Sequence, residues 1–293
     1  MVASIEYIER TIENYQKATQ ANRETPGREG TVDVITPEIA DDVMITGDLH
    51  GHRRNFMLIR RIADLANNPR RHLILQEVCH GGPTYPQNGG DMSHGLLEEV
   101  AKFKIEFPDQ VHFILGNHEL SELTEYPIQK NKQMLNLLFR LGLQHMYGPA
   151  TEKVREAYLP FFETCPLAVR MSGGVFISHS IPEQLDSRSS SNKFDPTIFT
   201  RQPTPMEYLE RGSIFDLVWG RDYREENARA FAEMVDATVL VNGHEPCPEK
   251  GYCVPNPYQV ILDGCNDHGV YMILPLKETW TQADVVEQIQ SLQ

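Results

Sequence analysis

Residues 111–119 have the sequence Val111-His112-Phe113-Ile114-Leu115-Gly116-Asn117-His118-Glu119. Its apolar part is typical of a buried strand, and Gly116 ends that strand. The three residues that follow supply an amide, an imidazole and a carboxylate. Open α/β sheets carry their chemistry outside the carboxyl ends of their strands. We therefore predict a functional site around Asn117 and His118.

Three other apolar runs end in the same way. Residues 43–46 lead into Gly47-Asp48-Leu49-His50-Gly51, residues 175–178 lead into His179, and residues 238–241 lead into Asn242-Gly243-His244. Carboxylate, imidazole and amide groups are hard or borderline metal ligands. A single histidine or asparagine near a turn usually has only a structural role. Four strand ends that carry such ligands indicate a metal site.

Taken in order, these motifs resemble the calcineurin-like metallophosphoesterases, and in particular the phosphoprotein phosphatase branch. Residues 215–222, Phe-Asp-Leu-Val-Trp-Gly-Arg-Asp, look like the Asp-Leu-Leu-Trp-Ser-Asp-Pro of that branch, and Gly251-Tyr252 follows Gly243-His244-Glu245. The resemblance covers roughly residues 41–274. It implies a four-layer α/β/β/α sandwich of two mixed sheets flanked by helices, with the metal site at the carboxyl ends of the strands.

The same resemblance implies the ligands of two metal ions. Asp48 and His50 would bind the first ion, and Asn117, His179 and His244 would bind the second. Nitrogen and oxygen ligands without a thiolate suit divalent or mixed-valence ions of Mn, Fe or Zn, and also Mg. A metal pair of this kind activates the water that lies between the ions for in-line attack on phosphorus.

The second motif of the family, Gly-Asp-x-x-Asp-Arg-Gly, is replaced in this chain. The predicted strand of residues 71–77 ends in Gln76-Glu77-Val78-Cys79-His80-Gly81-Gly82. Glu77 offers the same carboxylate as the bridging aspartate of the family, one methylene further out, and we predict that it bridges the two ions. Gly90-Asp91 competes for this place, but no apolar strand leads into it. We interpret residues 83–90 as an insertion.

His118 takes the role of general acid in this resemblance and would protonate the departing alkoxide. In the family, the second aspartate of the missing motif orients that histidine. When the match resumes at Ser93, Asp91 falls close to this position, whereas simple counting places His80 there. We favour Asp91, because a carboxylate stabilises an imidazolium in a way that a second histidine does not.

Two arginines that bind phosphate in the family are also missing, and Leu115 stands at one of the two positions. Arg221, in Trp-Gly-Arg-Asp, and Arg53, at the start of the helix that follows His50, are the candidates for substrate binding. An arginine can hold a phosphate through two parallel hydrogen bonds. A solvated surface arginine is the structural alternative for both.

The leading functional hypothesis is a metallophosphoesterase that hydrolyses phosphomonoesters, with phosphoserine or phosphothreonine in proteins as candidate substrates. The alternative within the enzymes is a hydrolase for small nucleotides such as dinucleoside polyphosphates, because related proteins share the same cage. A different alternative is a degenerate, non-catalytic metal-binding scaffold, which the lost motif and the missing arginines motivate. Metal-dependent turnover separates the enzymes from the scaffold.

The remaining segments predict a simple domain organisation. Residues 1–36 are expected to form an amphipathic helix, capped by Ser4, and a connector. Residues 37–275 form the metallophosphoesterase domain, and residues 276–293 a short terminal helix. Within the domain, residues 258–263 and 270–274 are expected to be paired strands of a second sheet.

Charge and composition exclude several classes of partner. The formal net charge of −14 argues against nucleic acid, whose binding relies on clustered Lys and Arg. Acidic residues near the N-terminus do not suit a signal peptide, and no run reaches the ~20 apolar residues of a membrane span. Five scattered cysteines without a Cys-x-x-Cys pair suit reduced thiols. The sequence therefore predicts a soluble, cytoplasmic protein.

Overall fold

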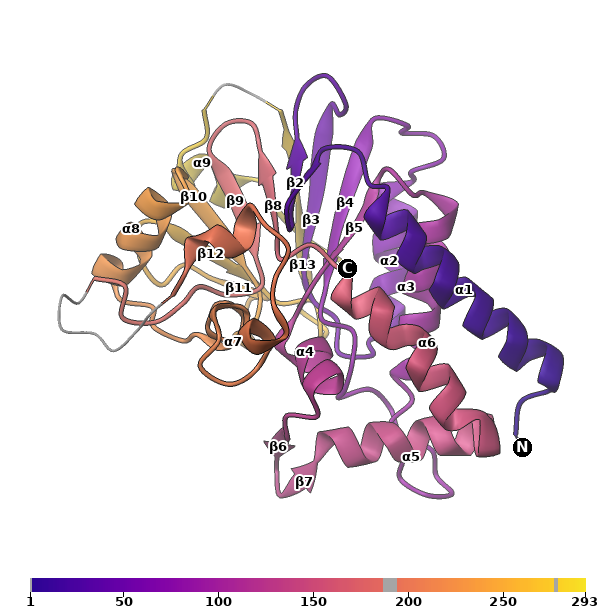
Figure 1. The fold of residues 1–293 in the computed structure, drawn as a ribbon. Helices are drawn as coiled ribbons and strands as arrows, with labels where there is room; N and C mark the ends of the chain where they lie inside the picture. Colours follow the sequence, from indigo (N-terminus) through magenta and orange to yellow (C-terminus); the bar gives the residue numbers. More distant parts are fainter. Residues whose placement is uncertain (1, 187–193, 277–278) are drawn as a thin grey trace.

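The apolar runs of the sequence form strands, and these strands build two mixed sheets (Figure 1). The computed structural model describes residues 2–186, 194–276 and 279–293. The first sheet has the strand order β14-β13-β3-β4-β5. Its strands are β3 (Asp42–Asp48), β4 (Arg71–Gln76), β5 (Val111–Ile114), β13 (Val270–Pro275) and β14 (Ile289–Ser291). Because β3, β4 and β5 run parallel, their carboxyl ends meet at one edge of this sheet.

The second sheet has the strand order β1-β2-β8-β9-β10-β12-β11. Its strands are β1 (Arg28–Glu29), β2 (Val32–Ile35), β8 (Ala168–Met171), β9 (Val175–Ser178), β10 (Val239–Asn242), β11 (Tyr252–Cys253) and β12 (Gln259–Leu262). β9, β10 and β12 run parallel, so this sheet also gathers several strand ends at one edge. A separate hairpin joins β6 (Gln129–Lys130) to β7 (Gln133–Met134).

The strands have two apolar faces because both sheets are covered on both sides. In β3, Val43 and Ile45 belong to the core between the sheets, whereas Met44 belongs to the core under the helices. This alternation follows from the period of two along a strand. Two mixed sheets that pack together and carry helices outside confirm the predicted fold class.

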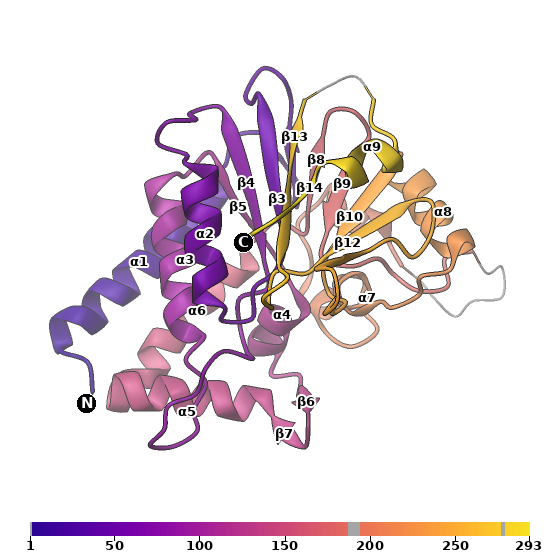
Figure 2. The same cartoon turned by 180° about the vertical axis from the view of Figure 1, so that it is seen from behind.

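Helices cover the outer faces of both sheets (Figures 1 and 2). On the side of the five-stranded sheet lie α1 (Ile5–Arg23), α2 (Arg53–Ala63), α3 (His94–Glu106) and α6 (Thr151–Glu163). On the side of the seven-stranded sheet lie α7 (Ser213–Trp219) and α8 (Glu225–Met234), and α4 (Asn117–Thr124), α5 (Leu135–Tyr147) and α9 (Gln282–Glu287) complete the helices named here. Ser4 caps α1, as predicted, by accepting a hydrogen bond from Tyr7 N at 3.2 Å. None of the described helices is both long and apolar enough to cross a membrane.

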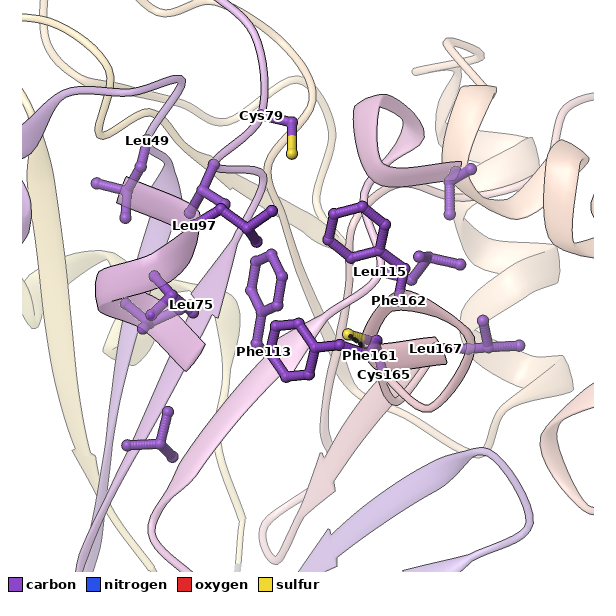
Figure 3. Packing of buried hydrophobic residues seen from close by; sticks show 14 of the residues in the cluster. Leu49, Leu75, Cys79, Leu97, Phe113, Leu115, Phe161, Phe162, Cys165 and Leu167 are labelled. Carbon is purple, nitrogen blue, oxygen red and sulfur yellow. Dashed lines mark hydrogen bonds between the residues drawn. The ribbon is translucent and has the colours of Figure 1, made fainter. Parts of the chain in front are cut away.

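The core between the five-stranded sheet and its helices is rich in aromatic side chains. Phe113 of β5 stacks on Phe161 of α6 with ring centroids 5.8 Å apart, and both side chains are fully buried (Figure 3). Leu75, Leu97 and Phe162 lie in the same cluster. This packing fixes the ends of β4 and β5, from which two of the predicted site residues emerge.

The structure changes two expectations about the outer segments. Residues 276–293 form α9 and then β14, whose Ile289 pairs with Met272 of β13. The predicted connector before residue 36 contains β1 and β2, and β2 pairs in parallel with β8. These strands have only two to four residues, which is too short for a periodic signal in the sequence. The boundaries at residues 36 and 275 remain predictions.

The expected pairing of residues 258–263 with residues 270–274 is wrong. β12 pairs with β10 in the seven-stranded sheet, whereas β13 pairs with β3 in the five-stranded sheet. Both strands are apolar for the same reason, since Leu262 and Met272 belong to the single core between the sheets. The two runs lie in opposite layers of that core and not side by side in one sheet.

Candidate metal centre

Five predicted ligands stand at or directly after the carboxyl ends of strands in both sheets. Asp48 is the last residue of β3, Glu77 follows β4, and Asn117 begins α4 shortly after β5. His179 follows β9, and His244 follows β10 by one residue. All five side chains are buried. The fold therefore brings together residues that are up to 196 positions apart, as the hydrogen bond from His244 N to Asp48 Oδ2 at 2.8 Å shows.

Four ligand atoms converge in the first part of this centre. Asn117 Oδ1 lies 2.9 Å from His179 Nε2 and 2.8 Å from His244 Nδ1. His179 Nε2 lies 3.2 Å from His244 Nδ1 and 3.3 Å from Glu77 Oε2. Ligands bound tetrahedrally to one ion at ~2.1 Å would lie roughly 3.4 Å apart. We name these four residues the Asn117 group, and their spacing fits one metal ion.

The hydrogen bonds behind His179 decide which of its nitrogens faces this group. Gln76 Nε2 donates to Thr46 O at 2.9 Å, so that Gln76 Oε1 is free to accept from His179 Nδ1 at 3.0 Å. With its proton on Nδ1, the neutral imidazole turns the lone pair of Nε2 toward Asn117 Oδ1. Two acceptors in contact repel each other unless a cation lies between them, so this arrangement fits a metal ligand.

The second part of the centre contains Asp48, His50 and Glu77, which we name the Asp48 group. His50 Nδ1 lies 3.2 Å from Cys79 O, to which it donates, and His50 Nε2 lies 3.6 Å from Glu77 Oε2. Asp48 Oδ1 is buried and has no hydrogen-bond partner among the described residues. Burial, followed by the charge of Glu77, raises the pKa of Asp48 well above its usual range. Such an orphaned carboxylate oxygen also fits a cation.

Glu77 belongs to both groups. Its Oε1 accepts from His118 N at 2.9 Å, while its Oε2 faces the imidazoles of His179 and His50. Its backbone is in the left-handed region, with φ 41°, and its carbonyl oxygen accepts from Leu49 N and His50 N. Although burial opposes ionisation, the neighbouring His179 and His118 hold the pKa of Glu77 well below its usual range. The structure thus places the Glu77 carboxylate next to residues of both the Asn117 group and the Asp48 group.

A second buried glutamate holds the turn that carries Glu77. Glu119 Oε1 accepts from Val78 N and from Cys79 N, each at 2.9 Å. Because Glu119 follows Asn117 on the first turn of α4, it ties the segment after β4 to that helix. No separate role for Glu119 follows from the sequence alone.

The structure corrects the assignment of Asp91 as the residue that orients His118. His118 Nδ1 lies 3.0 Å from His80 Nδ1. Asp91 Oδ1 instead accepts from Ser93 N at 2.7 Å, and Asp91 N donates to Leu138 O of α5 at 2.8 Å. The turn of residues 83–90 therefore delivers Asp91 to the start of α3 and to α5. His80, the alternative from simple counting, stands beside the general-acid candidate.

Sequence reasoning missed the residue behind His80. His80 Nε2 lies 2.9 Å from Glu122 Oε1, and both side chains are buried. The signal was present, because His118 and Glu122 are four residues apart in α4 and therefore share a face of that helix. His80 lies between these two side chains and contacts both. Because His80 comes from a different segment of the chain, this contact could not be predicted from the spacing within α4.

The two arginine candidates differ in their surroundings. Arg221 pairs with the Glu245 carboxylate, and its Nη2 donates to His244 O at 3.4 Å. Arg53 is exposed on the first turn of α2, next to Gly95. The structure therefore brings Arg221 next to a residue of the Asn117 group. Trp219 also contacts this group, edge to face with His244 at 6.3 Å between ring centroids.

The fold is similar to that of known phosphatases. A protein serine/threonine phosphatase from Saccharomyces cerevisiae, described as similar to human phosphatase PP5, superposes with a TM-score of 0.68 at 14% identity, over 96% of this chain and 88% of that chain. A cold-active protein-tyrosine phosphatase of a psychrophilic Shewanella species superposes with a TM-score of 0.52 at 12% identity, over 89% and 82% of the two chains. At these identities the likeness concerns the fold.

The family model described as calcineurin-like phosphoesterase matches residues 42–273. This range begins at the first residue of β3 and reaches into β13, so it includes every residue of the Asp48 group and of the Asn117 group. The chain belongs to the calcineurin-like phosphoesterase family.

Proposed function

We propose that this protein hydrolyses phosphomonoesters, with phosphoserine and phosphothreonine side chains of proteins as its candidate substrates. Membership of the family makes the chain a metal-dependent phosphoric ester hydrolase. The observation that carries the proposal is the close approach of four potential ligand atoms in the Asn117 group. Four of the distances between these atoms are 3.3 Å or less, and the atoms are Asn117 Oδ1, His179 Nε2, His244 Nδ1 and Glu77 Oε2. A backbone carbonyl of Cys79 and the amide oxygen of Gln76 already orient His50 and His179, which preorganises the site.

The two groups would hold two divalent ions that share Glu77. The Asp48 group supplies Asp48, His50 and Glu77, and the Asn117 group supplies Glu77, Asn117, His179 and His244. A bound pair of ions would lower the pKa of a metal-bound water and would neutralise charge on the phosphoryl oxygens. The donor set suits Mn, Fe, Zn or Mg.

Side chains around the two groups would perform the other steps. His118 follows the ligand Asn117 directly and lies beside His50, with ring centroids 4.7 Å apart. It would donate a proton to the leaving oxygen of the ester. Arg221 would bind the phosphoryl group from the side of His244. This assignment compensates for the arginines that the chain lacks, including the one replaced by Leu115.

The proposed function predicts turnover that depends on added metal. We expect the chelator-treated protein to hydrolyse p-nitrophenyl phosphate at least ~100-fold more slowly than the same protein after addition of Mn²⁺, because the ions supply several kcal/mol of transition-state stabilisation. The measurement compares p-nitrophenyl phosphate, bis(p-nitrophenyl) phosphate and a dinucleoside tetraphosphate, each with Mn²⁺, Fe²⁺, Zn²⁺ and Mg²⁺. Preference for the dinucleotide would support the nucleotide hydrolase instead. Absence of turnover with all four metals would refute the proposal.

The assignment of Arg221 has a matched control in Arg224. Both arginines are about half exposed and line the same open cavity of about 460 Å³, and each forms an ion pair with a carboxylate. Only Arg221 contacts His244. We expect Arg221→Ala to raise KM for p-nitrophenyl phosphate roughly tenfold, as the loss of one charge-assisted hydrogen bond does. Arg224→Ala should stay within about twofold of wild type. An increase in KM for Arg221→Ala no larger than that for Arg224→Ala would contradict the assignment of Arg221.

A further inference from the structure

We propose that Glu122 is a positioning residue for His118 and acts through His80. The inference rests on the proposed role of His118 as general acid. Three side chains form a chain of hydrogen bonds, from Glu122 Oε1 to His80 Nε2 at 2.9 Å and from His80 Nδ1 to His118 Nδ1 at 3.0 Å. We name these residues the Glu122 chain. His80 and Glu122 are almost completely buried, with side-chain exposures of 0% and 1%.

The donors and acceptors of the Glu122 chain allow only one arrangement while both imidazoles are neutral and the carboxylate is ionised. A carboxylate can only accept, so His80 must donate from Nε2. Neutral His80 then presents the lone pair of Nδ1, and His118 must donate to it from its own Nδ1. Nε2 of His118 is thereby left outside the chain. His118 serves as a general acid after this nitrogen has taken up a proton, because the resulting imidazolium still donates from Nδ1 to His80 and can give the Nε2 proton to the leaving oxygen. Glu122 thus decides, across two imidazoles, which nitrogen of His118 is available.

Glu122 and His80 are themselves held in place from several sides. Glu122 Oε1 also accepts from Asn136 Nδ2 at 3.1 Å, and Glu122 Oε2 accepts from Tyr158 OH at 3.2 Å. The ring of Phe139 packs edge to face against His80 at 5.3 Å between centroids. The backbone of His80 is in the left-handed region, with φ 64°, and its N–H donates to Ser93 Oγ at 2.9 Å. Helices α4, α5 and α6 therefore all fix the Glu122 chain.

The Glu122 chain supplies the carboxylate that His80 alone lacks as a replacement for the orienting aspartate of the family. The required carboxylate is present, but it lies one imidazole further from His118. The insertion of residues 83–90 carries Asp91 away, and Glu122 on the same helix as His118 supplies the acceptor instead. We infer that the role of one aspartate is divided here between His80 and Glu122.

A second chain of two histidines and a carboxylate, which here belongs to an aspartate, offers a control. His72 Nδ1 lies 2.8 Å from His112 Nε2, and His112 Nδ1 lies 2.7 Å from Asp33 Oδ2. All three residues are buried. His72 and His112 lie near the N-terminal ends of β4 and β5, whereas the metal centre lies at the carboxyl ends, and Asp33 belongs to β2 of the other sheet. A histidine–histidine–carboxylate chain can therefore be purely structural. The Glu122 chain differs in ending beside Glu77, whose Oε1 accepts from His118 N.

The test measures Glu122→Gln with two substrates that differ in their need for a general acid. Glutamine keeps the size of the side chain but can both donate and accept, so it no longer dictates the tautomer of His80. We expect kcat for phenyl phosphate to fall ~10- to 100-fold, with KM within about twofold. For p-nitrophenyl phosphate, whose leaving group needs little protonation, kcat should fall less than about threefold. Metal content should be unchanged.

Two further variants separate positioning from a general loss of structure. In the background of His118→Asn, Glu122→Gln should have no further effect on kcat, because the residue through which it acts is gone. Asp33→Asn should lower the thermal midpoint but change kcat for the two substrates equally. Equal losses on both substrates in Glu122→Gln, or full additivity with His118→Asn, would overturn the inference. If wild type turned over neither substrate, the proposed function itself would fail.

A measurement on the wild type does not depend on any variant folding. Long-range ¹H–¹⁵N NMR of the metal-free protein distinguishes the two nitrogens of each neutral imidazole. We expect His80 to carry its proton on Nε2 and His118 to carry its proton on Nδ1. A neutral His118 with its proton on Nε2 would contradict the proposed chain directly.

Discussion

Glu77→Gln is expected to lower the turnover of p-nitrophenyl phosphate by at least ~1000-fold and to leave at most one tightly bound metal ion per chain. Glu77 is the residue that the two groups of potential ligands share. Glutamine preserves an oxygen that can accept from His118 N, but it removes the negative charge between the two sites. Loss of the second ion removes several kcal/mol of transition-state stabilisation, and each 1.4 kcal/mol corresponds to a factor of ten in rate. Metal analysis and steady-state kinetics on the same preparation test both parts.

Glu119→Gln is the matched control for this substitution. Glu119 is also buried close to the centre, but its Oε1 accepts two backbone hydrogen bonds, which a glutamine oxygen can keep. We expect this variant to keep both ions and to lose less than about tenfold in turnover. Glu77→Asp tests the length of the side chain, because it restores the residue type of the family on a backbone placed for a glutamate. Two retained ions and nearly full turnover in Glu77→Gln would show that Glu77 does not bridge.

The site residues that were predictable share one property, which is that their position follows from strand direction alone. Asp48, Asn117, His179 and His244 stand at or just beyond the ends of strands that run parallel within their sheets, so their convergence follows from the topology. Glu77 was predictable from its place after β4, although its residue type departs from the family.

Residues whose position depends on a loop path were not predictable in the same way. Asp91 lies near the expected position in sequence, but its backbone N–H donates a hydrogen bond to Leu138 O of α5. No local sequence pattern predicts this contact. Gln76 fixes the tautomer of His179 from a distance of 103 residues. Its importance follows only when the amide of Gln76 is seen to donate to Thr46. Short strands such as β14 are equally difficult to predict, because they are defined by their pairing with another strand and not by a periodic pattern in the sequence.

His118→Asn is expected to lower kcat for phenyl phosphate ~100- to 10,000-fold, as the removal of a general acid does. The loss with p-nitrophenyl phosphate should be much smaller, because its leaving group departs without a proton. Asparagine can still donate a hydrogen bond toward His80, so the surrounding chain keeps a partner. His52→Asn is the control histidine, since His52 caps α2 by accepting from Asn55 N and lies two residues after His50. It should change kcat by less than about threefold.

The same variant decides between two roles for His118. A nitrogen of His118 lies close enough to ligand atoms of His50 and Glu77 for the three residues to hold an ion together. As a ligand, His118 would be needed for metal content, and its replacement would impair both substrates alike. As a general acid, it would leave metal content at the wild-type value and impair mainly the ester with the poor leaving group. The hydrogen bond to His80 occupies Nδ1 and leaves one nitrogen for the substrate, so we expect the second result.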